Sequence, residues 1–264
     1  MLIPRDLPFP LRARAFQAAT RIIATVLRTA ITHYFEVRAA GLGNLPQRGP
    51  AIVAGNHPSL LDGLLLYLLS PVRLRFMAHR ELFRHPCIGW LMRGLGFINA
   101  GNRSQALRDA EQALRAGEVM VVFPEGAAYD RGRMEQLYPG VGVLAIRTAA
   151  TIVPLGIAGA AEAFPLGAWV PRPAAIALRI GRPVCYATAP LAPGAHVPER
   201  ELTAALIDLR RRIVALREEA TRELDIPRPI KLMRRLEIIA CGLVLIPLVV
   251  GLTVTAHELQ PPRP

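Results

Sequence analysis

The sequence predicts an α/β protein: a layered domain with a largely parallel or mixed central sheet flanked by helices. Between residues 37 and 223, short β-rich runs alternate with helical stretches, which is typical of strands joined by helices. The β-rich runs are apolar throughout, as expected for strands that are buried on both faces. A length of 264 residues allows one large domain with appended segments.

The predicted elements follow from local composition and from the residues that begin and end helices. Pro58 suits the start of the first helix, and Gly117 suits the residue that follows the second. Strands are expected at residues 51–55, 74–78, 119–123, 152–157 and 176–180. Helices are expected at 60–69, 104–116, 142–150 and 210–223, and a loop rich in Ala, Gly and Pro at 160–173.

The composition excludes several classes of protein. Hydrophobic residues make up 52% of the chain, which is too much for a disordered protein. The 3 cysteines, Cys87, Cys185 and Cys241, have no paired spacing and support neither a disulfide framework nor a zinc site. A formal net charge of +12 favours phosphate-bearing partners. Because only 6% of residues are aromatic and no nucleic-acid-binding motif occurs, we expect membrane lipids and no nucleic acid.

The N-terminal end carries a first signal of membrane contact. Residues 16–34 contain no Gly or Pro and are expected to form an amphipathic helix. Arg14, Arg21 and Arg28 recur at heptad spacing and therefore share one face of that region. Such a helix lies at a membrane interface or, alternatively, packs on the domain.

The C-terminal end carries a second signal. Residues 238–256 contain no charged side chain, and at about 1.5 Å per residue they nearly span a hydrocarbon layer of ~30 Å. A spanning helix or a re-entrant hairpin kinked at Pro247 is expected, with a hairpin buried against the domain as the alternative. The basic residues 231–235 precede this segment, so the positive-inside rule places the domain on the cytoplasmic side of the cell membrane. The expected organisation is an interfacial helix at 1–35, an α/β domain at 36–225, and a basic linker with the membrane segment at 226–264.

Residues 56–62 carry the clearest chemical signal. His57 follows the first predicted strand, at the end where α/β sheets place ligand sites. Pro58 holds His57 in an extended conformation outside the helix, so Asp62 in the first helical turn can reach back to it. A carboxylate on one imidazole nitrogen fixes the tautomer and leaves the other nitrogen available as a general base.

Three ordered motifs resemble the glycerophospholipid acyltransferase family, which includes the lysophosphatidic acid acyltransferases. They are Asn56-His57 with Asp62, then Phe123-Pro124-Glu125-Gly126, then Ile152-Val153-Pro154-Leu155. The resemblance covers about residues 36–185. It implies transfer of an acyl group from acyl-CoA or acyl carrier protein to the free hydroxyl of a lysophospholipid, foremost 1-acylglycerol-3-phosphate, giving phosphatidic acid.

The resemblance also implies a role for each motif residue. His57 is the implied general base and Asp62 its orienting partner, while Asn56, Glu125 and Gly126 are implied substrate contacts. No covalent acyl-enzyme is needed, and no Gly-x-Ser-x-Gly elbow occurs in the chain. A nucleophilic Ser59 is the competing interpretation.

Two motifs depart from the family pattern. Where the family continues Phe-Pro-Glu-Gly with Thr-Arg-Ser, this chain has Ala127-Ala128-Tyr129. Where the family has Phe-Ile-Asp-Arg, this chain has a longer segment from Phe97 that ends in Arg103. We therefore expect Arg103, with Arg131 or Arg133, to replace the missing contact to the phosphate of the acceptor.

The remaining interpretations concern water, lipid and metal. A thioesterase or hydrolase would use the same His–Asp pair on water, and an inactive lipid-binding protein would use neither residue chemically. No cofactor is expected, because the acyl donor is itself a substrate. No metal is expected either: His79, His85 and Cys87 cluster in the sequence, but their spacing matches no standard zinc site.

Overall fold

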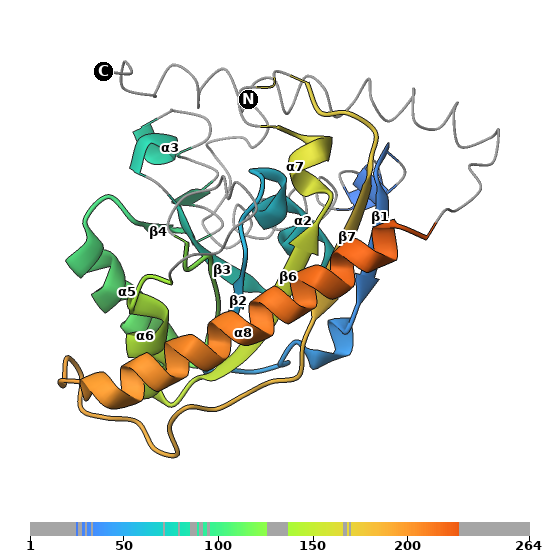
Figure 1. The fold of residues 1–264 in the computed structure, drawn as a ribbon. Helices are drawn as coiled ribbons and strands as arrows, with labels where there is room; N and C mark the ends of the chain where they lie inside the picture. Colours follow the sequence, from blue (N-terminus) through green and yellow to red (C-terminus); the bar gives the residue numbers. More distant parts are fainter. Residues whose placement is uncertain are drawn as a thin grey trace, which may run out of the picture.

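A seven-stranded mixed sheet forms the centre of the structure (Figure 1). The structure is a computed structural model that describes residues 25, 28–29, 31–32, 34–70, 72–78, 80–84, 89, 92–93, 96–125, 137–165, 168 and 170–226. The sheet order is β1-β7-β6-β2-β5-β3-β4. The strands are β1 Glu36–Ala40, β2 Ala51–Gly55, β3 Leu74–Ala78, β4 Ile98–Asn99, β5 Val119–Val122, β6 Thr151–Ala158 and β7 Ala175–Ile180.

Most neighbouring strands are parallel. β2 lies between β5 and β6 and is parallel to both, with Ala51 opposite Val119 on one side and Thr151 on the other. β3 is parallel to β5 and β4 is parallel to β3. β7 is antiparallel to β6, and β1 is parallel to β7. Consequently β6, β2, β5, β3 and β4 all present their carboxyl ends at one edge of the sheet.

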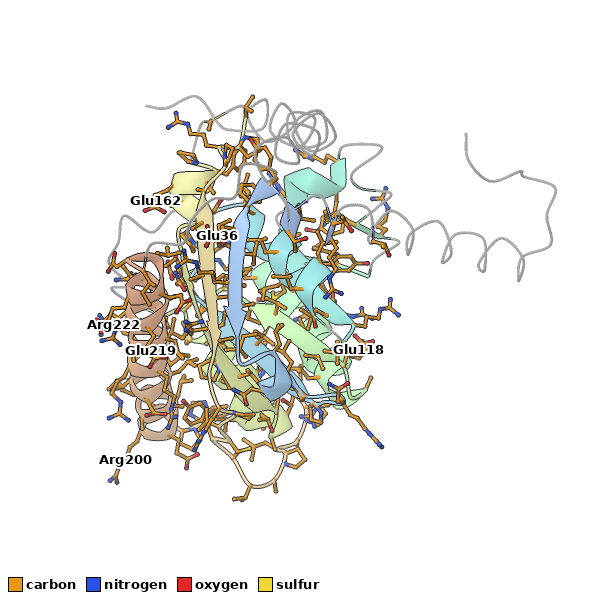
Figure 2. The ribbon with its side chains drawn as sticks, turned by 90° about the vertical axis from the view of Figure 1, so that its right-hand side faces the viewer. Glu36, Glu118, Glu162, Arg200, Glu219 and Arg222 are labelled. Carbon is orange, nitrogen blue, oxygen red and sulfur yellow. The ribbon has the colours of Figure 1, made fainter. Side chains whose placement is uncertain are left out.

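Helices cover both faces of the sheet. In Figure 1, α8 crosses the front of the sheet beside α5 and α6, and α2 lies behind it. Figure 2 shows the layers edge-on, with Glu219 and Arg222 on the outer side of α8. The helices are the 3-10 helix Leu42–Asn44, α2 Leu61–Leu69, α3 Arg80–Arg84, α5 Arg103–Arg115, α6 Gly140–Thr148, α7 Ala160–Ala163 and α8 Glu199–Leu224.

The two large clusters of the apolar core lie on opposite faces of the sheet because side chains alternate along each strand. Val53 of β2 packs in the cluster on the α2 side, whereas Ile52 and Ala54 pack against α5, α6 and α8. All five residues of β2 are buried, which explains its continuous apolar run.

Local signals set the ends of the long helices. The side chain of Asn102 caps α5 by accepting a 3.1 Å hydrogen bond from the Gln105 N–H. Gly117, just beyond α5, has φ +81°, a conformation that favours glycine, as the sequence predicts. α8 crosses β6 at Gly156, where a Cβ would meet the backbone of Leu216 and Arg217.

The end of α8 is fixed to the edge strand β1. The buried side chain of Arg38 donates hydrogen bonds to the Glu223 and Ile226 carbonyls, and it pairs with Glu36. Arg179 of β7 pairs with the Glu223 carboxylate at 2.8 Å. Cations at the carboxyl end of a helix satisfy its last carbonyls and oppose its dipole.

The predicted α/β class and the mixed sheet are confirmed, with differences in individual elements. β1 and β4 were not expected, because β1 contains Arg38 and β4 has only 2 residues. α8 begins at Glu199 rather than residue 210, directly after Pro198, and α7 occupies the start of the predicted loop.

The two predicted membrane segments fall largely outside the described residues. Within the described part, Ile31 and Tyr34 are buried in the domain core, and the Tyr34 hydroxyl donates to the Pro171 carbonyl at 2.7 Å. No helix among the described residues has the length and apolar character needed to cross a bilayer. The predicted C-terminal segment, residues 238–256, lies outside the described residues.

Candidate active site

The predicted catalytic residues lie at the edge where parallel strands end. His57 follows β2 and Glu125 follows β5, its neighbour in the sheet. Parallel strands bring residues that follow them to the same edge, where open α/β sheets bind ligands. Glu162 on α7, beyond the end of β6, marks this end in Figure 2, and Glu118, before the start of β5, marks the opposite end.

Asn56 holds the chain where it leaves β2. Its side-chain amide donates to the Ile157 carbonyl at 2.8 Å and accepts from the Ile157 N–H at 2.8 Å. The residue is 1% exposed, so both hydrogen bonds are shielded from water. The main chain is free to turn at this point because the side chain continues the pairing with β6. The sequence predicts a substrate contact for Asn56, whereas in this structure its side-chain amide forms hydrogen bonds with the protein backbone.

The turn that follows brings His57 and Asp62 together. Nδ1 of His57 lies 2.9 Å from Oδ2 of Asp62, and the same oxygen accepts a 2.8 Å hydrogen bond from the Ser59 N–H. Asp62 is in the first turn of α2, which begins at Leu61. His57 lies outside the helix, so a separation of five residues is compatible with contact. The sequence predicted this pair from the position of Pro58.

Burial sets the electrostatics of the pair. The Asp62 side chain is 0% exposed, and among the described residues its Oδ1 has no hydrogen-bond partner. Burial raises the pKa of Asp62 above its ordinary value, against the lowering effect of the hydrogen bonds from His57 and Ser59. The His57 side chain is 18% exposed, so the imidazole has an opening to the outside.

Ser59 is occupied by structural hydrogen bonds. Its hydroxyl donates to the Phe164 carbonyl at 3.1 Å and accepts from the Leu61 N–H at 3.3 Å. The residue is 1% exposed. This arrangement links the turn that holds His57 to the segment after α7 and favours a structural role over the alternative of a nucleophilic serine.

Residues after β5 complete the centre of the site. The Phe123 ring stacks on the His57 imidazole with centroids 4.0 Å apart and planes 10° apart. Glu125 is half-buried, with one carboxylate oxygen shielded from solvent. Gly126, Arg131 and Arg133, predicted to contact substrate, lie outside the described residues.

Arg103 lies farther along the same edge. It is the first residue of α5 and follows β4, which stands three strands from β2, or about 14 Å at the usual strand spacing. Its side chain is exposed, and the guanidinium carbon lies 5.4 Å from the centroid of the Tyr138 ring. A cation over an aromatic face is held in place but keeps its charge.

The sequence did not reveal how Phe123 and Phe164 contribute. Phe123 belongs to a quoted motif, but its contact with His57 depends on β5 being the neighbour of β2. Phe164 contributes a carbonyl, which carries no side-chain signal. Among the described residues, no group of three or more His, Cys, Asp or Glu side chains could hold a metal ion. His79, His85 and Cys87 lie outside them.

The same stretch of chain matches known proteins. A family model described as Acyltransferase matches residues 36–158. The chain is 36% identical over 160 residues to an uncharacterized protein of Mycobacterium leprae. This alignment covers 55% of this chain and 42% of that protein. It is 28% identical over 184 residues to a 1-acyl-sn-glycerol-3-phosphate acyltransferase of Pseudomonas aeruginosa, covering 66% of this chain and 69% of that one.

A solved structure shares the fold. The crystal structure of PlsC, the 1-acyl-sn-glycerophosphate (LPA) acyltransferase of Thermotoga maritima, matches with a TM-score of 0.63 and 26% identity, covering 86% of each chain. This chain spans 42–43% of the length of the mycobacterial relatives that it matches. The three motifs lie within the matched residues 36–158, so the sequence similarity and the shared fold both point to acyltransferases of this kind.

Proposed function

We propose that the protein transfers a fatty acyl group from an acyl thioester to the hydroxyl of a lysophospholipid. The observation that carries this proposal is the His57–Asp62 pair, held at 2.9 Å at the carboxyl edge of the sheet within the residues that match the Acyltransferase family model. The names of the Pseudomonas and Thermotoga proteins favour 1-acylglycerol-3-phosphate as the acceptor and phosphatidic acid as the product.

In the proposed reaction His57 acts first as a base and then as an acid. Oδ2 of Asp62 accepts from the Ser59 N–H and faces Nδ1, so Nδ1 carries a proton and Nε2 carries the lone pair. Nε2 takes the proton of the acceptor hydroxyl while the hydroxyl oxygen attacks the thioester carbonyl. The new C–O bond forms, the C–S bond breaks, and the proton passes from Nε2 to the leaving thiolate. Asp62 stabilises the intervening imidazolium.

Arg103 is the candidate residue for binding the phosphate of the acceptor. A phosphate monoester carries nearly two negative charges, which a binding site offsets with Arg side chains, backbone N–H groups or a helix start. Arg103 begins α5 and therefore combines a guanidinium with the positive end of a 13-residue helix. With Ala128 where the family has Arg, we propose that Arg103 contacts the phosphate, assisted by Arg131 or Arg133.

The direct test is an acyl-transfer assay on the full chain in detergent. A panel of lysophospholipids is offered with acyl-CoA and with acyl carrier protein as donors, and both the acylated lipid and free fatty acid are measured. His57→Ala should lower turnover by about 10²–10⁴-fold, since it removes a positioned base. His196→Ala, a change at an exposed histidine, is the matched control.

Each rival has its own result in that assay. Release of free fatty acid without an acceptor, abolished by His57→Ala, would identify a hydrolase. Lipid binding with no turnover for any donor would identify a lipid-binding protein. Near-normal turnover of His57→Ala would rule out the proposed mechanism.

The phosphate role of Arg103 has a separate test. The acceptor KM is measured for Arg103→Ala with a phosphorylated and an uncharged lysolipid, and the donor KM is measured alongside. Loss of a charged hydrogen bond costs about 1.5–3 kcal/mol, so the KM for the phosphorylated acceptor should rise roughly 10- to 150-fold. Arg108→Ala, on the same helix, is the control. An equal change for both acceptors would exclude the phosphate contact.

We also propose that residues 238–256 anchor the protein in the cell membrane with the α/β domain on the cytoplasmic side. The supporting observation is the uncharged apolar segment preceded by basic residues 231–235. Truncation before residue 230 should move protein from the membrane fraction to the soluble one, apart from any retained by the N-terminal helix. Full-length protein that carbonate extracts from membranes would contradict a spanning segment.

A further inference from the structure

The proposed reaction makes no use of one close contact in the site. The Phe123 ring lies face to face with the His57 imidazole, at a centroid distance of 4.0 Å and an interplanar angle of 10°. Phe123 directly follows β5, and the pairing of Val122 with Ala54 brings it beside the end of β2. The contact is therefore a consequence of strand register.

Asp62 alone does not fix the imidazole. Its 2.9 Å contact with Nδ1 sets the direction of one edge of the ring but leaves the ring able to rotate about that hydrogen-bond axis. A flat ring against the imidazole face opposes this rotation, because tilting either ring would lose stacking contact or cause overlap. The direction of Nε2, the atom that receives the substrate proton, then depends on both contacts.

The stacked ring also acts on charge. An aromatic face attracts a cation placed over it, so Phe123 favours the imidazolium over the neutral imidazole. In the proposed reaction the imidazolium forms as the hydroxyl proton is removed. A group that stabilises the imidazolium lowers the barrier to that step.

We propose that Phe123 is a positioning residue that orients the Nε2 atom of His57 and stabilises its imidazolium. This inference rests on the proposed function for its catalytic consequence, but the effect on the imidazole exists without substrate. Among the described residues, the charged groups nearest in the chain to His57 and Phe123 are Asp62 on α2 and Glu125, which follows Phe123 by two residues. Glu162 on α7 is exposed, and Arg103 lies about three strand spacings away. A substitution of Phe123 leaves all of these charges in the protein.

The test compares Phe123→Leu with Phe123→Tyr. Leucine removes the aromatic face, so kcat should fall about tenfold or more with acceptor and donor KM little changed, whereas tyrosine should keep most of kcat. The acid limb of kcat/KM should move to lower pH in Phe123→Leu by about 0.4–1.5 pH units, the size expected for a lost cation–π contact. In Phe123→Tyr it should stay near its wild-type position.

Phe97→Leu is the matched structural control. Phe97 stacks on Phe76 with centroids 5.1 Å apart, so its loss removes a similar aromatic contact that involves no histidine. We expect Phe97→Leu to lower the thermal midpoint to a similar extent without moving the acid limb. If Phe123→Leu does not fold, Phe123→Met, whose unbranched side chain adapts to the available space and also lacks the aromatic face, replaces it.

A second readout is independent of turnover. The His57 ring is titrated by NMR in the substrate-free, histidine-labelled protein, with its signal assigned by its loss in His57→Ala. The ring signal should reach half of its total change at a lower pH in Phe123→Leu than in the wild-type protein, and at the wild-type pH in Phe97→Leu. An unchanged His57 titration in Phe123→Leu, or a loss of kcat that Phe123→Tyr shares equally, would overturn the proposal. Failure to detect acyl transfer in the wild-type protein would instead count against the proposed function and leave the titration result standing.

Discussion

Asp62 and Glu111 are two buried carboxylates toward opposite ends of the sheet, and they differ in their hydrogen-bond partners. Asp62, at the edge where β2 ends, accepts from His57 and Ser59 through Oδ2, and its Oδ1 has no hydrogen-bond partner among the described residues. Glu111, near the other end of α5, receives hydrogen bonds from Arg115, Arg147 and the Gly194 N–H. The pKa values of the two carboxylates are accordingly shifted in opposite directions.

Burial acts on both residues, but only at Asp62 does it prevail. Burial raises the pKa of Asp62 above its ordinary value. Burial also favours the neutral form of Glu111, yet the hydrogen bonds from Arg115 and Gly194 and the nearby arginine charges hold its pKa below the ordinary value.

The comparison separates a carboxylate that links parts of the fold from a carboxylate whose proposed role is in the reaction. Arg115 also donates to the Leu191 carbonyl and Arg147 to the Ala195 carbonyl, so Glu111 joins α5, α6 and the segment before α8. The hydrogen-bonding groups of this cluster are directed at the protein itself. The His57–Asp62 pair leaves Nε2 for a substrate.

The largest effect is expected for Asp62→Asn. Loss of the carboxylate removes the group that fixes the His57 tautomer and stabilises the imidazolium, so kcat should fall about 10²–10⁴-fold. Stability should be unchanged or higher, since the variant no longer buries a carboxylate at low dielectric. Activity and thermal unfolding are measured on the same preparation. A loss of stability in Asp62→Asn as large as that in Glu111→Gln would contradict the proposed difference between the two sites.

Asn56→Ala tests a residue at the edge of the proposed active site whose side-chain amide bonds to the protein backbone. The change leaves the Ile157 N–H and carbonyl buried without their partners, at a cost of about 1–3 kcal/mol each. Denaturant unfolding should show a loss of about 2–6 kcal/mol, together with lower kcat. Asn44→Ala, which removes a single hydrogen bond to the Ile180 carbonyl, is the control and should cost less. A stable Asn56→Ala with a raised acceptor KM would favour the predicted substrate contact instead.

Glu111→Gln should reverse the pattern of Asp62→Asn. Weakening the contacts to Arg115 and Arg147 should lower the free energy of unfolding by about 1–3 kcal/mol, a drop of several degrees in Tm. kcat per folded molecule should stay the same. Asp109→Asn, two residues before Glu111 on the same helix and in contact with Gln105, is the control. A large loss of kcat in Glu111→Gln would mean that the two ends of the sheet are coupled.

The smallest effect concerns pH and has opposite signs at the two sites. The lowered pKa of Glu111 gives stability that is present above its unfolded pKa of about 4.3 and is lost as pH falls through its folded pKa. The Tm gap between wild type and Glu111→Gln should therefore narrow under acid. The raised pKa of Asp62 favours the folded state below its unfolded pKa of about 3.9, and this contribution is lost as pH rises through the folded pKa. The stability of the wild-type protein relative to Asp62→Asn should therefore fall as pH rises. The same slope with pH for this stability difference and for the difference between wild type and Glu111→Gln would contradict this account.

The fold was predictable where local pattern decides it. Buried strands such as β2 and β3 have the predicted bounds, because an apolar run between turn residues is a local signal. The direction of β7 was left open, although residues 160–173 gave a clue: a parallel return normally needs a crossover helix, and this segment holds only the 4-residue α7. The two-residue β4 offers too little pattern to be recognised.

The site divides in the same way. His57 and Asp62 belong to one turn, so their contact follows from Pro58 and the helix start. Asn56 meets Ile157 across a separation of 101 residues, and Ser59 meets Phe164 across 105. Those contacts depend on strand order and register, which no single motif contains. The same is true of the stacking of Phe123 on His57.

The bond pattern of Asn56 has a consequence for mutational tolerance. A side chain that imitates a peptide unit must carry one donor and one acceptor at a fixed reach, and among the twenty amino acids only Asn and the longer Gln have both on a planar amide. A saturation screen should therefore find position 56 intolerant even in a catalytically silent His57→Ala background, when scored by protein abundance. Positions that serve only the chemistry would become permissive there, so such a screen separates residues that shape this edge from residues that act at it.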